Sequence, residues 1–158
     1  MPCLRTRRAG HSDFRRGIGG QSRVALVRTL RGWSTRVRRA LLELHSELLR
    51  AQRIEAEWVV GRMSASETLQ AAVDDMRFSW IPTVSALISE LDEAIGADGP
   101  EGQAAFDGVF RRAGGLFVPP DPDTAFGARY LRALRDHPGV VLAHRDVAAA
   151  LEVEPPTH

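Results

Sequence analysis

The sequence predicts an all-α protein, built as a single bundle of about six helices with one long N-terminal helix and a disordered basic N-terminal tail. Apolar residues recur every three or four positions through most of the chain, which is the period of a helix with one buried face. No segment alternates apolar and polar residues over the length of a strand. Residues 1–21 show no apolar period and end among Gly17, Gly19 and Gly20, which is typical of a disordered segment.

The folded domain is expected over residues 22–154, and its first helix over about residues 23–61. An apolar seam with alternating spacings of three and four runs along this helix, formed by Val37, Leu41, Leu44, Leu48, Ala51 and Trp58. Glu55 interrupts the seam, and Gly61 stands where a helix commonly ends. If Val37, Leu41 and Leu44 extend beyond the bundle, they offer a dimer surface.

Two shorter helices are expected next. Ser64 and Glu67 form a capping box, which opens a helix that runs through Leu69, Val73 and Met76. The stretch of residues 77–96 contains the next helix, which has Pro82 near its first turn, where a missing N–H costs little, and ends at Gly96. Its apolar residues fall on one face: Val84, Leu87, Ile88, Leu91 and Ile95.

Three further helices complete the predicted bundle. The fourth begins at Pro100 and ends at Gly114-Gly115, and the proline-rich stretch 116–123 links it to the fifth. Asp121-Pro122 is a suitable cap and first turn for that fifth helix. Residues 136–139 end the fifth helix, and the last helix runs from about Val140 to Leu151.

The amino-acid composition indicates the base composition of the coding genome and excludes several classes of protein. All 21 basic residues are Arg, and Lys and Asn are absent, which indicates GC-rich coding DNA and favours a high-GC bacterium. The single cysteine, Cys3, excludes an intramolecular disulfide framework and a multi-cysteine zinc site. It also favours a reducing, cytoplasmic location. No run of about 18 apolar residues occurs, so no membrane span is expected.

Charge is divided unevenly along the chain. Residues 1–39 hold eleven Arg and one Asp, whereas residues 40–158 hold ten Arg and nineteen acidic residues. The nucleic-acid-binding candidates are Arg28, Arg31, Arg36, Arg38 and Arg39. A segment this basic binds phosphates without reading sequence, and salt weakens that binding. The alternatives are a solvated arm, an upstream extension that is not natively translated, or pairing with acidic residues of the same or another copy.

The motifs of metal and nucleophile chemistry are missing. No Glu stands three residues before a His, and neither a metalloprotease HExxH motif nor a phosphate-binding loop with its lysine is present. The nucleophile elbow GxSxG is also absent. We therefore expect no catalytic residue, no metal and no cofactor, and the sequence favours a protein that is not an enzyme.

His45 and Trp80 are the candidates for binding a small ligand. His45 lies on the seam helix between Glu43 and Glu47, where it can serve as a ligand contact or as a half-buried residue paired with a carboxylate. Trp80 lies near a helix end, as do the other two tryptophans, Trp33 and Trp58. Tryptophans in such places usually close a core, with the indole N–H bonded to a carbonyl.

Residues 77–95 (RFSWIPTVSALISELDEAI) resemble the signature segment of an uncharacterised family of small all-helical bacterial proteins, and residues 45–70 and 139–151 resemble it in order and spacing. The resemblance covers about residues 38–151. It rests on His45, Gly61, Phe78, Trp80, Leu87, Ile88, Asp92, Glu93, His144 and Val147. Pro82 follows the Trp by two residues where the family has three, and Glu57-Trp58 replaces Glu-Tyr. The resemblance implies an all-α fold and a bacterial origin, and no activity.

These features together favour a protein–protein interaction or regulatory module, whose partner is another protein or a second copy of the chain. One alternative is non-specific binding of nucleic acid or an anionic surface through the Arg-rich segment. A second is ligand binding or enzyme activity near His45 and Trp80, which requires the two side chains to converge on one cavity.

Overall fold

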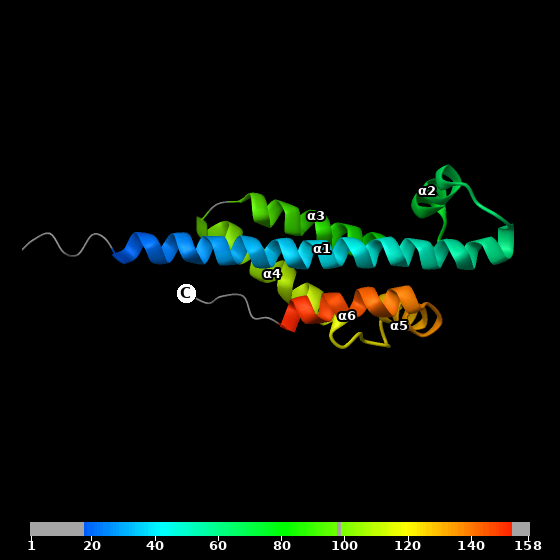
Figure 1. The fold of residues 1–158 in the computed structure, drawn as a ribbon. Coiled ribbons are helices and arrows are strands. Elements are labelled where there is room, and N and C mark those ends of the chain that lie inside the picture. The colour runs from blue at the N-terminus through cyan, green and yellow to red at the C-terminus, as the bar shows by residue number, and fades with distance from the viewer. Residues whose placement is uncertain (1–17, 98, 153–158) are drawn as a thin grey trace, which may run out of the picture.

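The computed structural model describes residues 18–97 and 99–152, with side chains described from residue 32 onward. Within those residues the chain forms six helices and no strand, which confirms the all-α fold (Figure 1). The helices are α1 (Ile18–Val60), α2 (Ala65–Asp74), α3 (Pro82–Gly96), α4 (Gly99–Phe117), α5 (Ala125–Asp136) and α6 (Pro138–Glu152). Residues 1–17 of the predicted tail lie outside the described residues.

The long helix α1 is the axis of the bundle, with α3 and α6 packed along its sides (Figure 1). It begins at Ile18, a few residues before the predicted start, because glycine is tolerated in a first turn whose N–H groups have no helical partner. It ends at Val60, and Gly61 takes the left-handed conformation expected of it, with φ 86°. The seam residues Val37, Leu41 and Leu44 are buried. The residues expected to offer a dimer surface are therefore covered within one chain, and self-association itself stays a prediction.

Burial of an aromatic ring carries α4 past its predicted end. The helix continues through Gly114 and Gly115 to Phe117, whose side chain is fully buried beside Phe126 and Tyr130. Burying a Phe side chain contributes about 1.5–3 kcal/mol, which offsets a helix propensity penalty of about 1 kcal/mol for each glycine. A second aromatic group, Trp33 with Phe106 and Phe110, closes the other end of the core.

The last two helices begin at residues other than those predicted. Thr124, not Asp121, is the N-cap of α5, and its hydroxyl accepts a hydrogen bond from the Gly127 N–H at 2.9 Å. Asp121 instead accepts from the Asp123 N–H inside the preceding turn. Helix α6 begins at Pro138, two residues before the predicted start, because proline at a first helical position has the required φ and no N–H to satisfy.

The bundle leaves one end of the molecule uncovered. The last turns of α1 extend past α5 and α6, and α2 stands beside them, apart from the packed helices (Figure 1). Trp33 and Trp80 are buried as expected, although the Trp33 indole N–H makes no hydrogen bond to the described residues. Trp58 does not close the core, since it is 86% exposed. The seam ends at Glu55, next to the turn before α6, so no helix lies over Trp58 to bury it.

Candidate functional site

His45 and Trp80 both lie between α1 and α3, each with its own polar partner. The Ser85 hydroxyl on α3 and Nε2 of His45 share a hydrogen bond of 2.8 Å. The Trp80 indole N–H donates to Oε1 of Gln52 at 3.0 Å. Because Gln52 follows His45 by two helical turns, the two bonds are about 10 Å apart along α1. Both polar groups are bonded to protein atoms, so their geometry adds nothing to the ligand-binding prediction.

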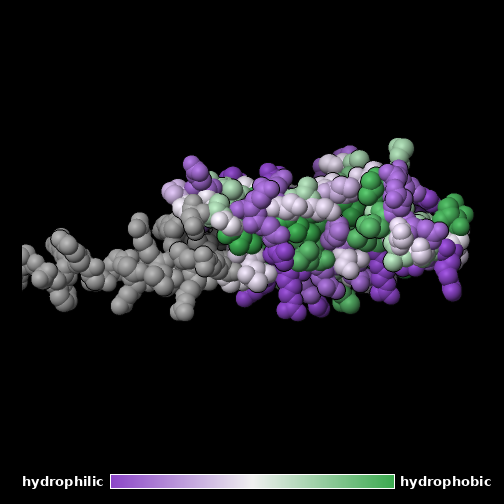
Figure 2. All heavy atoms as spheres, turned by 90° about the horizontal axis from the view of Figure 1, so that it is seen from above, coloured by the Kyte–Doolittle hydropathy of each residue, from purple (hydrophilic) through white to green (hydrophobic). Residues whose placement is uncertain are grey.

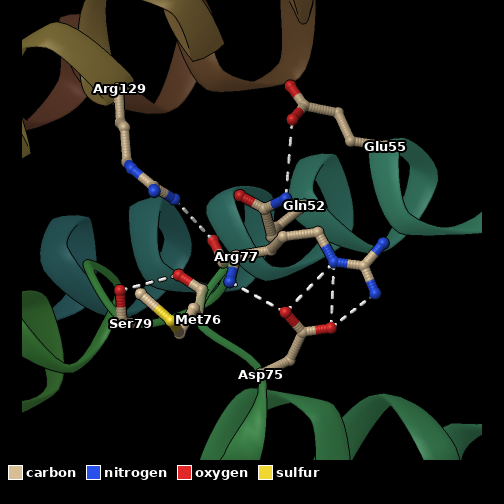
Figure 3. A network of polar contacts seen from close by, with 7 residues as sticks. All are labelled: Gln52, Glu55, Asp75, Met76, Arg77, Ser79 and Arg129. Atoms are coloured by element: carbon tan, nitrogen blue, oxygen red, sulfur yellow. Dashed lines mark hydrogen bonds and ion pairs between the residues drawn. The ribbon is translucent and has the colours of Figure 1, made fainter. Parts of the chain in front are cut away.

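Gln52 belongs to a group of polar side chains that lie between α1, the start of α3 and the turn before α6. The side chain is buried, and its amide also donates to Oε2 of Glu55 at 3.5 Å (Figure 3). Oε1 of Glu55 lies 3.5 Å from Nε2 of His137, in the turn between α5 and α6. The Trp80–Gln52 hydrogen bond fixes the start of α3 against α1, whereas Nε2 of His137 is buried and makes no hydrogen bond to the described residues. In the sequence, the interruption of the apolar seam at Glu55 indicates a polar contact here. The residues that Gln52 and Glu55 contact are too distant along the chain to be identified from the sequence.

The segment between α2 and α3 is anchored firmly to the bundle. Phe78 is fully buried, and the Arg129 guanidinium on α5 donates to the Arg77 carbonyl at 3.0 Å (Figure 3). Arg77 in turn pairs with Asp75, with Nε 2.9 Å from Oδ2, and this hydrogen bond holds the pKa of the Asp75 carboxyl below its usual range. The C-terminal side of α2 is therefore held by an apolar plug and an interhelical hydrogen bond.

The N-terminal side of α2 is anchored as well. Met63 is buried, its N–H donates to Oε1 of Glu57 at 2.9 Å, and Arg53 donates to its carbonyl. The Met63 N–H and the Arg53 guanidinium hold the pKa of Glu57 below its usual range. The predicted capping box is confirmed, with Ser64 and Glu67 each bonded to the other's backbone N–H.

Helix α2 between these anchors has no buried residue. The predicted helix through Leu69, Val73 and Met76 ends earlier, at Asp74, so Met76 lies in the following turn, and all three side chains face solvent. We call the exposed apolar residues of α2, its following turn and the last turn of α1 the apolar end. They are 59% to 86% exposed: Trp58, Val59, Val60, Leu69, Val73 and Met76. Figure 2, which looks onto the α2 and α3 side, shows hydrophobic surface at this end among hydrophilic residues.

Acidic side chains border the apolar end. Glu67 and Asp74 are exposed, and α2 contains no basic residue. An open depression runs along this helix, and its lining includes three carboxylates and no base: Glu67, Gln70, Ala71, Asp74, Asp75 and Met76. A binding partner that covers α2 therefore meets apolar side chains next to negative charge.

The predicted nucleic-acid-binding arginines divide into three groups. Arg36 and Arg39 are exposed on α1. Arg38 is engaged within the bundle, where its Nη2 donates to Oδ2 of Asp92 at 3.0 Å and lowers the pKa of that carboxyl. The side chains of Arg28 and Arg31 lie outside the described residues. Nucleic-acid binding through this segment stays a prediction.

Two further searches of the described residues concern metals and membranes. No three His, Cys, Asp or Glu side chains in that part of the chain gather closely enough to hold a metal ion. Among the described helices, none combines the length and apolar character needed to cross a membrane.

Comparisons of the chain with protein-family models, with curated proteins and with solved structures find no match. The resemblance of residues 77–95 to a bacterial family therefore rests on the quoted residues alone.

Proposed function

We propose that this chain is a protein–protein interaction module whose contact surface is the apolar end. The observation that carries the proposal is that α2 buries none of its residues although both of its ends are anchored to the bundle. A connection that served only to join α1 to α3 needs no apolar outer face. An anchored helix with such a face is suited to bind a partner without first having to order itself.

The residue types at the apolar end support the same proposal. Trp and Met are enriched at protein interfaces, and Trp is frequent among residues that dominate binding energy. Burying one large apolar side chain contributes about 1.5–3 kcal/mol. The six side chains of the apolar end are 59% to 86% exposed, so a partner that covers them removes apolar surface from water. The acidic border then selects the partner by charge.

Site-specific photo-crosslinking tests the proposal in the cells from which the protein comes. A photoreactive amino acid replaces Val73 on α2, and in the matched control it replaces Leu142, an exposed residue on α6. We expect a discrete crosslinked species from position 73 and none from position 142. In a variant that combines Leu69→Gln with the probe at position 73, we expect this crosslinked species to disappear. Equal crosslinking from both positions, or none from position 73, would overturn the proposal.

A further inference from the structure

The two ends of α1 differ in charge, and this difference points to the occupant of the apolar end. Residues 1–39 carry eleven Arg and one Asp, so the N-terminal end is strongly basic. The other end carries α2 with the exposed Glu67 and Asp74 and no basic residue, whereas Asp75 in the following turn is paired with Arg77 and Arg62 precedes the helix. A surface that is apolar and bordered by carboxylates is complementary to a segment that is apolar and basic.

The basic segment of this chain matches that description. Between residues 18 and 31 it contains three Arg together with apolar residues at helical spacings, namely Ile18, Val24, Leu26, Val27 and Leu30. Leu26 and Leu30 precede the buried Trp33 and Val37 by seven residues each, so the apolar pattern of α1 continues toward its N-terminus. In Figure 1 the first turns of α1 extend past the end of the bundle where α3 meets α4.

Within one molecule the helical part of the basic segment cannot reach α2. Helix α1 has 43 residues, which gives it a length of about 64 Å at 1.5 Å per residue. The basic segment begins the helix and α2 lies beside its end (Figure 1). Arg23, Arg28 and Arg31 can therefore meet α2 only when they belong to another copy of the chain.

We infer that the occupant of the apolar end is the basic N-terminal part of α1 from a second copy of this chain, in an antiparallel dimer. The inference rests on the proposed function and names its partner. Two copies with antiparallel α1 helices place each basic end on the other copy's apolar end. The two contacts are identical and related by a two-fold axis, so the assembly closes at two chains.

Light scattering on the full chain tests the stoichiometry. Over about 5 to 200 µM protein, we expect the mass to approach twice 17.4 kDa. Because the contact is partly ionic, raising NaCl from about 50 mM to about 500 mM should raise the dissociation constant at least tenfold. A chain that stays monomeric at every concentration overturns the inference.

Paired variants test which surfaces meet. Leu69→Gln with Val73→Gln on α2 should raise the dissociation constant at least tenfold, and so should Arg28→Gln with Arg31→Gln. The matched controls change exposed residues of the same types elsewhere, Val141→Gln with Leu142→Gln on α6, which are 45% and 57% exposed, and should leave the dimer unchanged. A dimer that the α2 pair does not weaken, or that the control pair weakens equally, overturns the inference.

Crosslinking of mixed isotopically light and heavy chains tests the antiparallel arrangement. From a photoreactive residue at position 73 we expect intermolecular products with peptides of residues 18–39, and products confined to other segments overturn the inference. The failures are distinguishable. A monomeric chain that crosslinks from position 73 to a different protein removes the inference and leaves the proposed function. A monomeric chain whose basic segment binds nucleic acid, with no crosslink from position 73, overturns both.

Discussion

The hydrogen bond between Trp80 and Gln52 allows a quantitative test of how α1 holds the start of α3. Both side chains are 7% exposed, and 3.0 Å separates the indole nitrogen from Oε1 of Gln52. Gln52→Leu removes the acceptor while it keeps similar volume, so the indole N–H stays buried without a partner. Such an unsatisfied group costs about 1–3 kcal/mol. We expect the free energy of unfolding to fall by about 2 kcal/mol, which lowers Tm by about 4–8 °C in a chain of this size.

Urea unfolding followed by far-ultraviolet circular dichroism measures this loss, and a double-mutant cycle assigns it to the pair. The cycle compares Gln52→Leu, Trp80→Phe and the double variant, in which neither polar partner is left unpaired. We expect the double variant to lose about 1 kcal/mol less than the sum of the single losses. Gln103→Leu is the control, since the Gln103 amide donates to Asp107 on its own helix. Additive losses, or a Gln52→Leu variant as stable as the parent chain, would refute the reasoning.

Three further predictions concern other parts of the fold. Burial lowers the pKa of His45 and of His144, so both contribute stability that is fully present above their unfolded pKa of about 6.5 and lost as pH falls through the folded pKa. The urea concentration at the midpoint of unfolding should therefore be lower at pH 5 than at pH 7.5. We expect this decrease to be smaller in His45→Gln, and an equal decrease in both chains would contradict the prediction. Gly127→Ala should cost at least about 2 kcal/mol, because a Cβ there would lie 1.8 Å from the Asp121 carbonyl oxygen; a normal melting temperature would contradict it. Trp58→Phe should change stability by less than about 0.5 kcal/mol while it removes the long-wavelength part of the tryptophan emission, since Trp33 and Trp80 are buried.

Helix periodicity and capping motifs predicted most of the fold, because each of these patterns is formed by residues that are close to one another in sequence. The spacing of Val84, Leu87 and Leu91 is enough to place α3 and its buried face. The capping box of Ser64 and Glu67 is complete within four residues, and it forms as expected. The predicted end of α4 was wrong because Phe117 contacts Phe126 and Tyr130 only in the folded bundle. That tertiary contact outweighs the glycine signal.

The same reasoning explains why the candidate surface was missed. A stripe such as Leu69, Val73 and Met76 predicts a helix with an apolar face, but periodicity does not say whether another helix covers that face. The outcome depended on the length of α1 relative to α5 and α6, which a pass along the sequence does not reveal. His45 lies on the long helix and Trp80 near the start of α3, as predicted, yet their partners Ser85 and Gln52 are distant in sequence.

The way α2 is anchored determines how much of its apolar surface remains for binding. Its position is fixed by buried Met63 and Phe78 and by hydrogen bonds to the backbone on both sides, so folding does not use Leu69, Val73 or Met76. Burying three such side chains contributes about 4.5–9 kcal/mol. Because the helix is already ordered, little of that energy is lost to fixing its backbone on association. A partner that covers α2 can therefore bind without any rearrangement of the bundle.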